Sequence, residues 1–135
     1  MEEVKLIQLP KILDDRGNLS FFENNKQIPF AIKRVYWIYD VPGGETRGGH
    51  GYKSLQEVVI ALSGSFDVVL FDGKEEKRFT LNRSYTGLYI PKMTWRHMEN
   101  FSTNSVALIV ADQDYNEEEY IRDIDAFMNL KKANK

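Results

Sequence analysis

The sequence predicts an all-β domain, either a sandwich or a barrel, followed by one helix at the C-terminal end. Short apolar runs recur along most of the chain, and turn-forming pairs such as Ser63-Gly64 and Asp72-Gly73 separate them. The residues after position 115 change to helical spacing. Strands at this density are typical of a double-layered or closed β architecture. With 135 residues, we expect one domain over residues 1–135.

About nine strand candidates follow one another along the chain. They cover residues 4–12, 19–23, 31–39, 57–62, 65–71, 77–81, 87–91, 95–100 and 105–111. In the third candidate, Arg34, Tyr36 and Ile38 share one face, because side chains alternate along a strand. The last candidate is almost wholly apolar, so we expect it to be buried on both faces.

The tail predicts a helix over about residues 117–132. Asn116 can cap it, and three Glu residues follow where the helix dipole favours negative charge. An apolar face with helical spacing should pack against the strands; it consists of Tyr120, Ile121, Ile124 and Phe127.

Composition argues against several functions. The chain has 18 Lys and Arg against 20 Asp and Glu, a net charge of −2, which disfavours binding to nucleic acid through phosphate neutralisation. The lack of Cys removes disulfides, thiolate catalysis and Cys-based metal sites. No apolar run approaches the roughly 20 residues that cross a bilayer, and the acidic N-terminus lacks signal-peptide order. We therefore expect a cytoplasmic protein with no membrane or nucleic-acid partner.

One set of spaced residues carries information about function: Gly44, His50, Tyr52, Glu57 and Gly64. Their spacing resembles the first half of the two-part signature of the cupin superfamily, and residues 87–100 resemble the second half more loosely. This resemblance implies a cupin-type double-stranded β-helix, a jelly-roll barrel, with the C-terminal helix added to it.

Metal-binding cupins resemble this chain at four ligand positions, which are His50, Tyr52, Glu57 and His97 here. Tyr52 stands where a second His belongs, and no Cys can replace it. Because the loss of one imidazole weakens a divalent site, we expect no metal and no other cofactor.

From about residue 5 to residue 127, the chain resembles the dTDP-4-keto-6-deoxyglucose 3,4-ketoisomerases. The matching stretches are residues 15–17, 28–30, 32–36, 47–50, 62–65, 87–90, 95–97 and 120–123. The resemblance implies a metal-free homodimer, with a strand exchanged between subunits, that makes a dTDP-3-keto-6-deoxyhexose for deoxysugar biosynthesis. The chain departs from this family at Tyr52, because members commonly have His there.

The catalytic candidates are His50, Tyr52, His97 and Arg16. An imidazole has the near-neutral pKa that a base at carbon 3 needs, so His50 is the candidate base. Tyr52 lies two residues further along the same extended segment and is the candidate acid or proton relay. The motif implies that His97 comes from the opposite strand. By resemblance Arg16 lies near the sugar, and its pairing with His97 favours a galacto-configured product.

The substrate-binding candidates are Arg47, Arg34, Tyr36 and Gly49. The planar fork of Arg47 suits a phosphate. Arg34 and Tyr36 share a strand face and could line a nucleotide pocket, and Gly49 would let a substrate approach the backbone. Three alternatives stay open: a sugar-nucleotide-binding cupin without catalysis, a dTDP-sugar epimerase, and a metal-dependent cupin enzyme.

Overall fold

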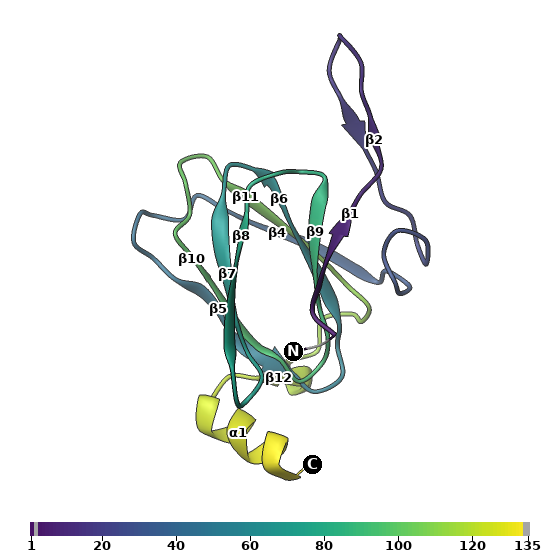
Figure 1. Ribbon diagram of the computed structural model, residues 1–135. Helices are drawn as coiled ribbons and strands as arrows, with labels where there is room; N and C mark the ends of the chain where they lie inside the picture. Colours follow the sequence, from purple (N-terminus) through teal and green to yellow (C-terminus); the bar gives the residue numbers. More distant parts are fainter. Residues whose placement is uncertain (2, 134–135) are drawn as a thin grey trace.

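The computed structural model describes residues 1 and 3–133, which form two antiparallel five-stranded sheets facing each other (Figure 1). The first sheet contains, in order, β1 (Lys5–Gln8), β9 (Thr86–Ile90), β6 (Glu57–Ser63), β11 (Val106–Ala111) and β4 (Arg34–Tyr39). The second contains β12 (Tyr120–Ile121), β5 (Arg47–Tyr52), β10 (Trp95–Glu99), β7 (Phe66–Phe71) and β8 (Glu76–Leu81). The predicted jelly-roll barrel with a C-terminal helix is confirmed.

Strand positions agree best in the middle of the chain. Each strand predicted between residues 57 and 111 lies within one residue of an observed strand, because clear turn pairs separate these strands. The predicted alternation of β4 is confirmed, since Trp37 is exposed while Tyr36 and Ile38 are half-buried. β11 lies between β6 and β4, and its residues are buried or half-buried throughout.

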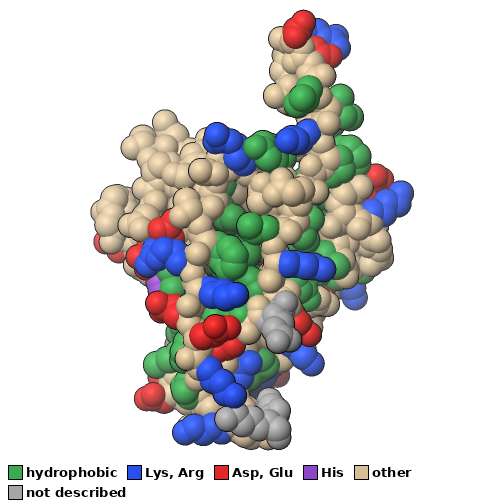
Figure 2. Space-filling view, in the orientation of Figure 1, with side chains coloured by type: hydrophobic (Ala, Val, Ile, Leu, Met, Phe, Trp, Pro, Cys, Tyr) green, Lys and Arg blue, Asp and Glu red, His purple; other side chains and the backbone are tan. Residues whose placement is uncertain are grey.

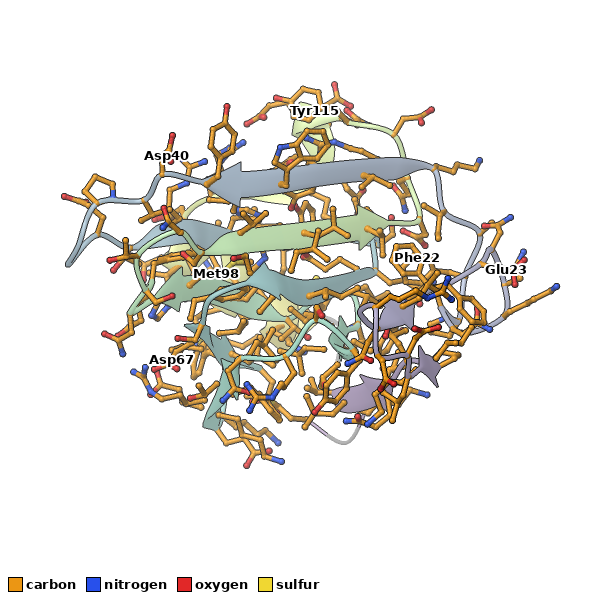
Figure 3. All side chains as sticks on the ribbon, turned by 90° about the horizontal axis from the view of Figure 1, so that it is seen from above. Phe22, Glu23, Asp40, Asp67, Met98 and Tyr115 are labelled. Carbon is orange, nitrogen blue, oxygen red and sulfur yellow. The ribbon has the colours of Figure 1, made fainter. Side chains whose placement is uncertain are left out.

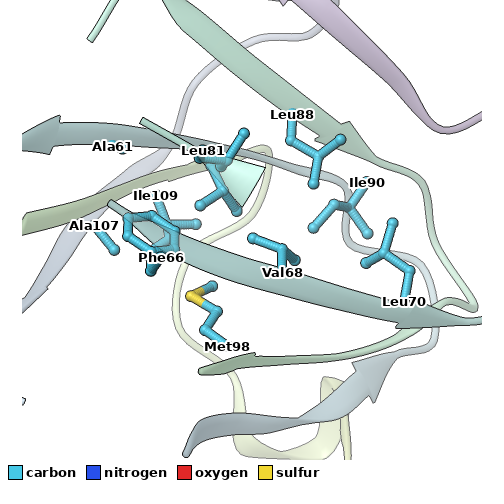
Figure 4. Close-up of a cluster of buried hydrophobic side chains, with 11 residues drawn as sticks. Ala61, Phe66, Val68, Leu70, Leu81, Leu88, Ile90, Met98, Ala107 and Ile109 are labelled. Carbon is cyan, nitrogen blue, oxygen red and sulfur yellow. The ribbon is translucent and has the colours of Figure 1, made fainter. Parts of the chain in front are cut away.

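An apolar cluster fills the space between the two sheets (Figure 4). Its buried members include Phe66, Leu70, Leu88 and Met98, each at most 1% exposed. Met98 lies inside the barrel, whereas Asp40 and Tyr115 lie at its periphery (Figure 3). Burying each such side chain stabilises the fold by about 1.5–3 kcal/mol, so this cluster holds the two sheets together.

The tail differs from the predicted helix over residues 117–132. A 3-10 turn, η1 (Glu117–Glu119), comes first and is capped by Asn116; β12 follows, and only then α1 (Ile124–Ala133). β12 pairs with β5, which buries Ile121 and satisfies backbone groups on that strand. The helix begins later because sheet pairing takes residues whose spacing also fits a helix. In α1, Phe127 is buried as predicted, but Ile124 is exposed.

A two-stranded arm, consisting of β2 (Lys11–Ile12), β3 (Leu19–Ser20) and the turn between them, stands away from the barrel (Figures 1 and 2). It exposes Ile12, Leu13 and Leu19, with Leu13 72% accessible. An isolated hairpin is marginally stable in water, so this arm lacks the support that the other strands have. Among the described residues, no helix is long and apolar enough to span a membrane.

Candidate active site

A cavity of about 450 Å³ lies where edge strand β4 of the first sheet meets β5 and β12 of the second. The charged or reactive side chains around it include Arg34, Tyr36, Arg47, His50, Tyr120 and Arg122. The cavity therefore combines one imidazole and two phenols with several guanidinium groups, which suits an anionic substrate that undergoes proton transfer.

His50 and Tyr52 form a buried hydrogen-bonded pair at this cavity. The imidazole Nε2 lies 2.9 Å from the phenolic Oη, and the two residues are 7% and 3% exposed. Burial, with smaller contributions from the positive charges of Arg96 and Arg122, lowers the pKa of His50 to about 2. Burial also raises the pKa of Tyr52 above its ordinary value. At neutral pH the imidazole is thus an uncharged base and the phenol keeps its proton.

A buried ion pair between Arg96 and Glu57 lies next to Tyr36 and Tyr52. Each of its two side chains is 1% exposed. Two guanidinium nitrogens of Arg96 donate to the carboxylate at 2.9 and 3.1 Å. Nη2, one of these two, also donates to the Tyr36 hydroxyl, and Nη1 donates to the Gly48 carbonyl, both at 3.0 Å. Burial alone would lower the pKa of Arg96, but Glu57 raises it, so the guanidinium stays charged.

Gly48 makes room for this guanidinium. Its φ is +76°, in the left-handed region, and a Cβ there would overlap Nη1 of Arg96. Glycine is therefore required twice, by backbone conformation and by space. The backbone of β5 at position 48 can therefore lie against the buried Arg96 of β10 because position 48 has no side chain.

Tyr120 completes the site, and the sequence analysis placed it wrongly on a helix face. It lies on β12 directly opposite Tyr52, and its hydroxyl accepts a hydrogen bond from Arg34 at 3.1 Å. Its ring centre lies 4.9 Å from that of His50 and 4.8 Å from that of Tyr52. The signal that could have found it is the match of residues 120–123 to the resembled family.

His97 does not lie opposite His50, which corrects the prediction. Arg96 occupies that register position, because β10 turns residues 96 and 98 inward and His97 toward the other face. There the His97 Nε2 lies 2.6 Å from a carboxylate oxygen of Glu99, and this contact lowers the pKa of Glu99. The motif spacing pointed to His97, but the neighbouring residue Arg96 is the one whose side chain faces inward.

The remaining candidates divide into two groups. Arg34, Tyr36, Arg47 and Gly49 line the cavity together with His50, as expected. Arg16 does not, because it lies in the turn of the arm between β2 and β3, where its 89% exposed side chain pairs with Asp14. Within one chain, therefore, Arg16 is separated from the other candidates.

The four cupin metal positions do not converge here. The carboxylate of Glu57 is held by Arg96, and His97 faces away from His50. Within residues 1 and 3–133, no group of three His, Asp or Glu side chains could hold a metal ion. A guanidinium inside the ligand set does not fit a divalent cation, so these four positions do not form a metal site.

A larger hollow of about 650 Å³ lies under α1. Lysines from four segments line it: Lys53, Lys74, Lys92, Lys131 and Lys132. Its lining includes neither His nor Tyr, whereas the smaller cavity contains both. Of these two hollows, the cavity at His50 is therefore the one that offers an imidazole and phenols for proton transfer.

Comparisons with known proteins agree with this geometry. The family model described as FdtA, WxcM-like, C-terminal, matches residues 2–132. The TDP-4-oxo-6-deoxy-α-D-glucose-3,4-oxoisomerase of Aneurinibacillus thermoaerophilus is 44% identical over 125 residues, which cover 93% of this chain and 90% of that protein.

Solved structures of 3,4-ketoisomerases are similar over nearly the whole chain. The enzyme from Helicobacter canadensis matches with a TM-score of 0.94 at 44% identity, covering 96% of this chain and 98% of that one. A variant of QdtA from Thermoanaerobacterium thermosaccharolyticum, in complex with TDP-4-keto-6-deoxyglucose, matches with a TM-score of 0.96 at 39% identity, covering 98% and 96%. The chain therefore belongs to the family of sugar 3,4-ketoisomerases, which are isomerases.

Proposed function

We propose that this protein converts dTDP-4-keto-6-deoxyglucose to a dTDP-3-keto-6-deoxyhexose. The observation that carries the proposal is the buried His50–Tyr52 pair at an arginine-lined cavity, in a chain 44% identical to an oxoisomerase of this type. The reaction moves a carbonyl from carbon 4 to carbon 3. Carbon 3 loses a proton, an enediolate forms, the proton of the 3-hydroxyl passes to the oxygen on carbon 4, and carbon 4 gains a proton, so no oxidant or reductant is consumed.

His50 removes the proton from carbon 3 in this mechanism. In the tautomer with hydrogen on Nε2, that N–H donates to Tyr52 and Nδ1 is the free base. Burial lowers the pKa of His50 and disfavours an imidazolium, so Nδ1 gains the carbon 3 proton as Nε2 passes its own proton to Tyr52.

Tyr52 and Tyr36 relay the proton onward. Tyr52 is buried behind His50, while Tyr36 lines the cavity. Their hydroxyl oxygens lie 3.5 Å apart, a long contact of the kind that commonly tightens when substrate binds. Arg96 donates to the Tyr36 oxygen and would stabilise a phenolate formed there. The relay thus joins the base on one side of the cavity to a donor on the other.

The guanidinium groups of Arg34, Arg47 and Arg122 bind the anionic parts of the substrate. All three line the cavity. A planar guanidinium donates two parallel hydrogen bonds to a phosphate and stabilises the developing enediolate oxygen. Gly49 presents backbone with no side chain in the way.

The dimer expected from the resemblance is part of the proposal. Edge strand β4 exposes an apolar face in which Trp37 is 58% accessible, and Trp37 also borders the cavity. The arm exposes Leu13 and carries Arg16 in its turn. Exchange of the arm between two copies would cover both apolar surfaces and bring Arg16 toward a cavity. Light scattering should give twice the chain mass, and Leu13→Ser should shift the protein to the monomer.

The deciding experiment incubates the protein with dTDP-4-keto-6-deoxyglucose in deuterated water and follows the proton NMR spectrum. A 3-keto hexose with deuterium at carbon 4 is expected, and its coupling constants check the predicted galacto configuration. That configuration has lost one support, because His97 does not border the cavity. His50→Gln should abolish both exchange and product.

One observation favours a second candidate, a sugar-nucleotide-binding protein without catalysis. Tyr52 replaces a His that the resembled family commonly has. Binding of dTDP without exchange at carbon 3, together with new activity in Tyr52→His, would select this candidate.

A cytoplasmic location is proposed with either function and is checked by cell fractionation.

A further inference from the structure

Tyr120 closes a triangle of three aromatic rings. His50 and Tyr52 lie with ring centres 4.8 Å apart, and the Tyr120 ring contacts both at nearly the same distance. The His50–Tyr52 hydrogen bond requires each ring to keep one orientation. With strand β5 beneath and Tyr120 against both rings, neither ring can turn without displacing the third.

Tyr120 is itself held on two sides. Its hydroxyl accepts a hydrogen bond from Arg34, and the guanidinium of Arg122 lies 4.3 Å from its ring centre. Cation–π contacts of this kind fix a ring against the cation that covers it. Arg122 is in turn held by the carboxylate of Glu117.

The segment that carries Tyr120, residues 115–122, is fastened to the barrel; we call it the strap. The carboxylate of Glu119 accepts hydrogen bonds from the Ser54 and Leu55 backbone N–H groups and from the Ser54 hydroxyl. The Lys53 N–H donates to the Glu119 carbonyl, and β12 pairs with β5. These contacts tie the strap to the strand that carries His50.

We propose that Tyr120 is a positioning residue, which holds the His50 imidazole and the Tyr52 phenol in their hydrogen-bonded orientation and shields the imidazole from water. The inference rests on the proposed function for its kinetic consequence only. Its structural consequence, the environment of His50, is measured separately.

Several groups act on the imidazole from neighbouring elements. Those in ring contact or with a charge effect on His50 are Tyr52 of β5, Tyr120 of β12, Arg96 of β10, Glu117 of η1 and Arg122, which follows β12. Burial is the largest cause of the lowered pKa. Removing the Tyr120 ring admits water to one side of the imidazole, so the pKa of His50 should rise toward its ordinary value.

The test compares Tyr120→Phe with Tyr120→Ala. Tyr120→Phe keeps the ring and should keep kcat within about threefold, whereas Tyr120→Ala should lower kcat by about 100-fold with a much smaller change in KM, because misplaced catalytic groups slow the chemical step. Tyr120→Leu keeps most of the volume without an aromatic face and serves if Tyr120→Ala does not fold. Tyr89→Ala, which removes a tyrosine ring from the opposite sheet, is the matched control and should leave kcat unchanged.

The readout independent of activity is NMR titration of the histidines. The chain has two, so their signals are separable. In the unmodified protein His50 should not titrate between about pH 5 and 8, and in Tyr120→Ala it should titrate nearer its ordinary pKa of about 6.5. An unchanged His50 titration, or equal kcat losses in Tyr120→Phe and Tyr120→Ala, would overturn the proposal. Absence of ketoisomerase turnover would instead count against the proposed function.

Discussion

The two ends of the barrel interior are equally buried but built differently. On β10, Met98 and Arg96 both point inward, with 0% and 1% exposure. Met98 meets an apolar cluster, while Arg96 makes four hydrogen bonds to a carboxylate, a carbonyl and a hydroxyl. Within the described residues, no buried side-chain nitrogen or oxygen lacks a partner.

The difference teaches where substitutions are tolerated. Apolar contacts are non-directional, so the apolar end tolerates exchanges among apolar side chains that conserve the volume. The polar end depends on individual hydrogen bonds in a medium of low polarity. There, the loss of one partner leaves another buried polar group without a hydrogen bond. Arg96 and Met98 are thus equally buried two residues apart on β10, but substitution is tolerated at Met98 and not at Arg96.

The largest expected effect is at Arg96. Arg96→Met should cost about 3–5 kcal/mol of unfolding free energy, because Glu57 stays buried without its counter-charge. Met98→Leu, its neighbour facing the same way, should cost less than about 1.5 kcal/mol. Urea denaturation of both variants makes the comparison, and equal losses would show that the two ends do not differ. Adding Glu57→Leu to Arg96→Met should recover stability without recovering activity.

A cavity at the apolar end should affect stability alone. Leu81→Ala should cost about 3 kcal/mol, because the transfer free energy is lost and the cavity is only partly filled. The kcat of the folded protein should stay unchanged, since Leu81 pairs with Phe66 and does not line the cavity at His50. Urea denaturation and initial rates at saturating substrate check the two parts. A drop in kcat would mean that packing at one end controls geometry at the other.

Gly48→Ala should cost about 2 kcal/mol, because a left-handed backbone is unfavourable for Ala and the new methyl group displaces Arg96. Activity should fall as well, since Arg96 holds Tyr36. In the Arg96→Met background the same change should cost only about 1 kcal/mol, the backbone part. A double-mutant cycle measures this coupling. Simple additivity of the two losses would contradict the clash.

The smallest expected effect is the pH dependence of stability. The pKa of His50 is lowered in the folded protein, so the unfolded chain binds a proton that the folded one does not between about pH 2 and 6.5. This contribution to stability is present above pH 6.5 and is lost as the pH falls. From pH 6.5 to 5.5 the unmodified protein should lose about 1 kcal/mol more than His50→Asn. Parallel pH curves for the two proteins would show that His50 is not shielded.

How far the sequence predicts this molecule depends on how local the signal is. Strands β6 to β11 are bounded by turn pairs such as Ser63-Gly64, so their limits follow from neighbouring residues. His50 and Tyr52 lie two apart on one extended segment, and their convergence is likewise local. These parts of the fold and site were predictable for that reason.

The parts that were missed depend on register and on distant segments. The choice between residues 96 and 97 requires knowing which face of β10 turns inward, and the spacing of the motif does not supply this. Tyr120 reaches the site because β12 pairs with β5, a contact between residues far apart in the chain. The spacing of apolar residues in the tail also fits a helix, so residues 120 and 121 were predicted to be helical and not paired with β5.

The fit between Gly48 and Arg96 has a consequence for how relatives of this protein can diverge. A side chain at position 48 overlaps the guanidinium, so position 96 must shorten before position 48 can gain a Cβ. The reverse order passes through an intermediate that carries both the strain and the displaced arginine. Natural selection therefore meets a one-way sequence of changes, in which the buried arginine decides when space opens at position 48, while the left-handed backbone still favours glycine there.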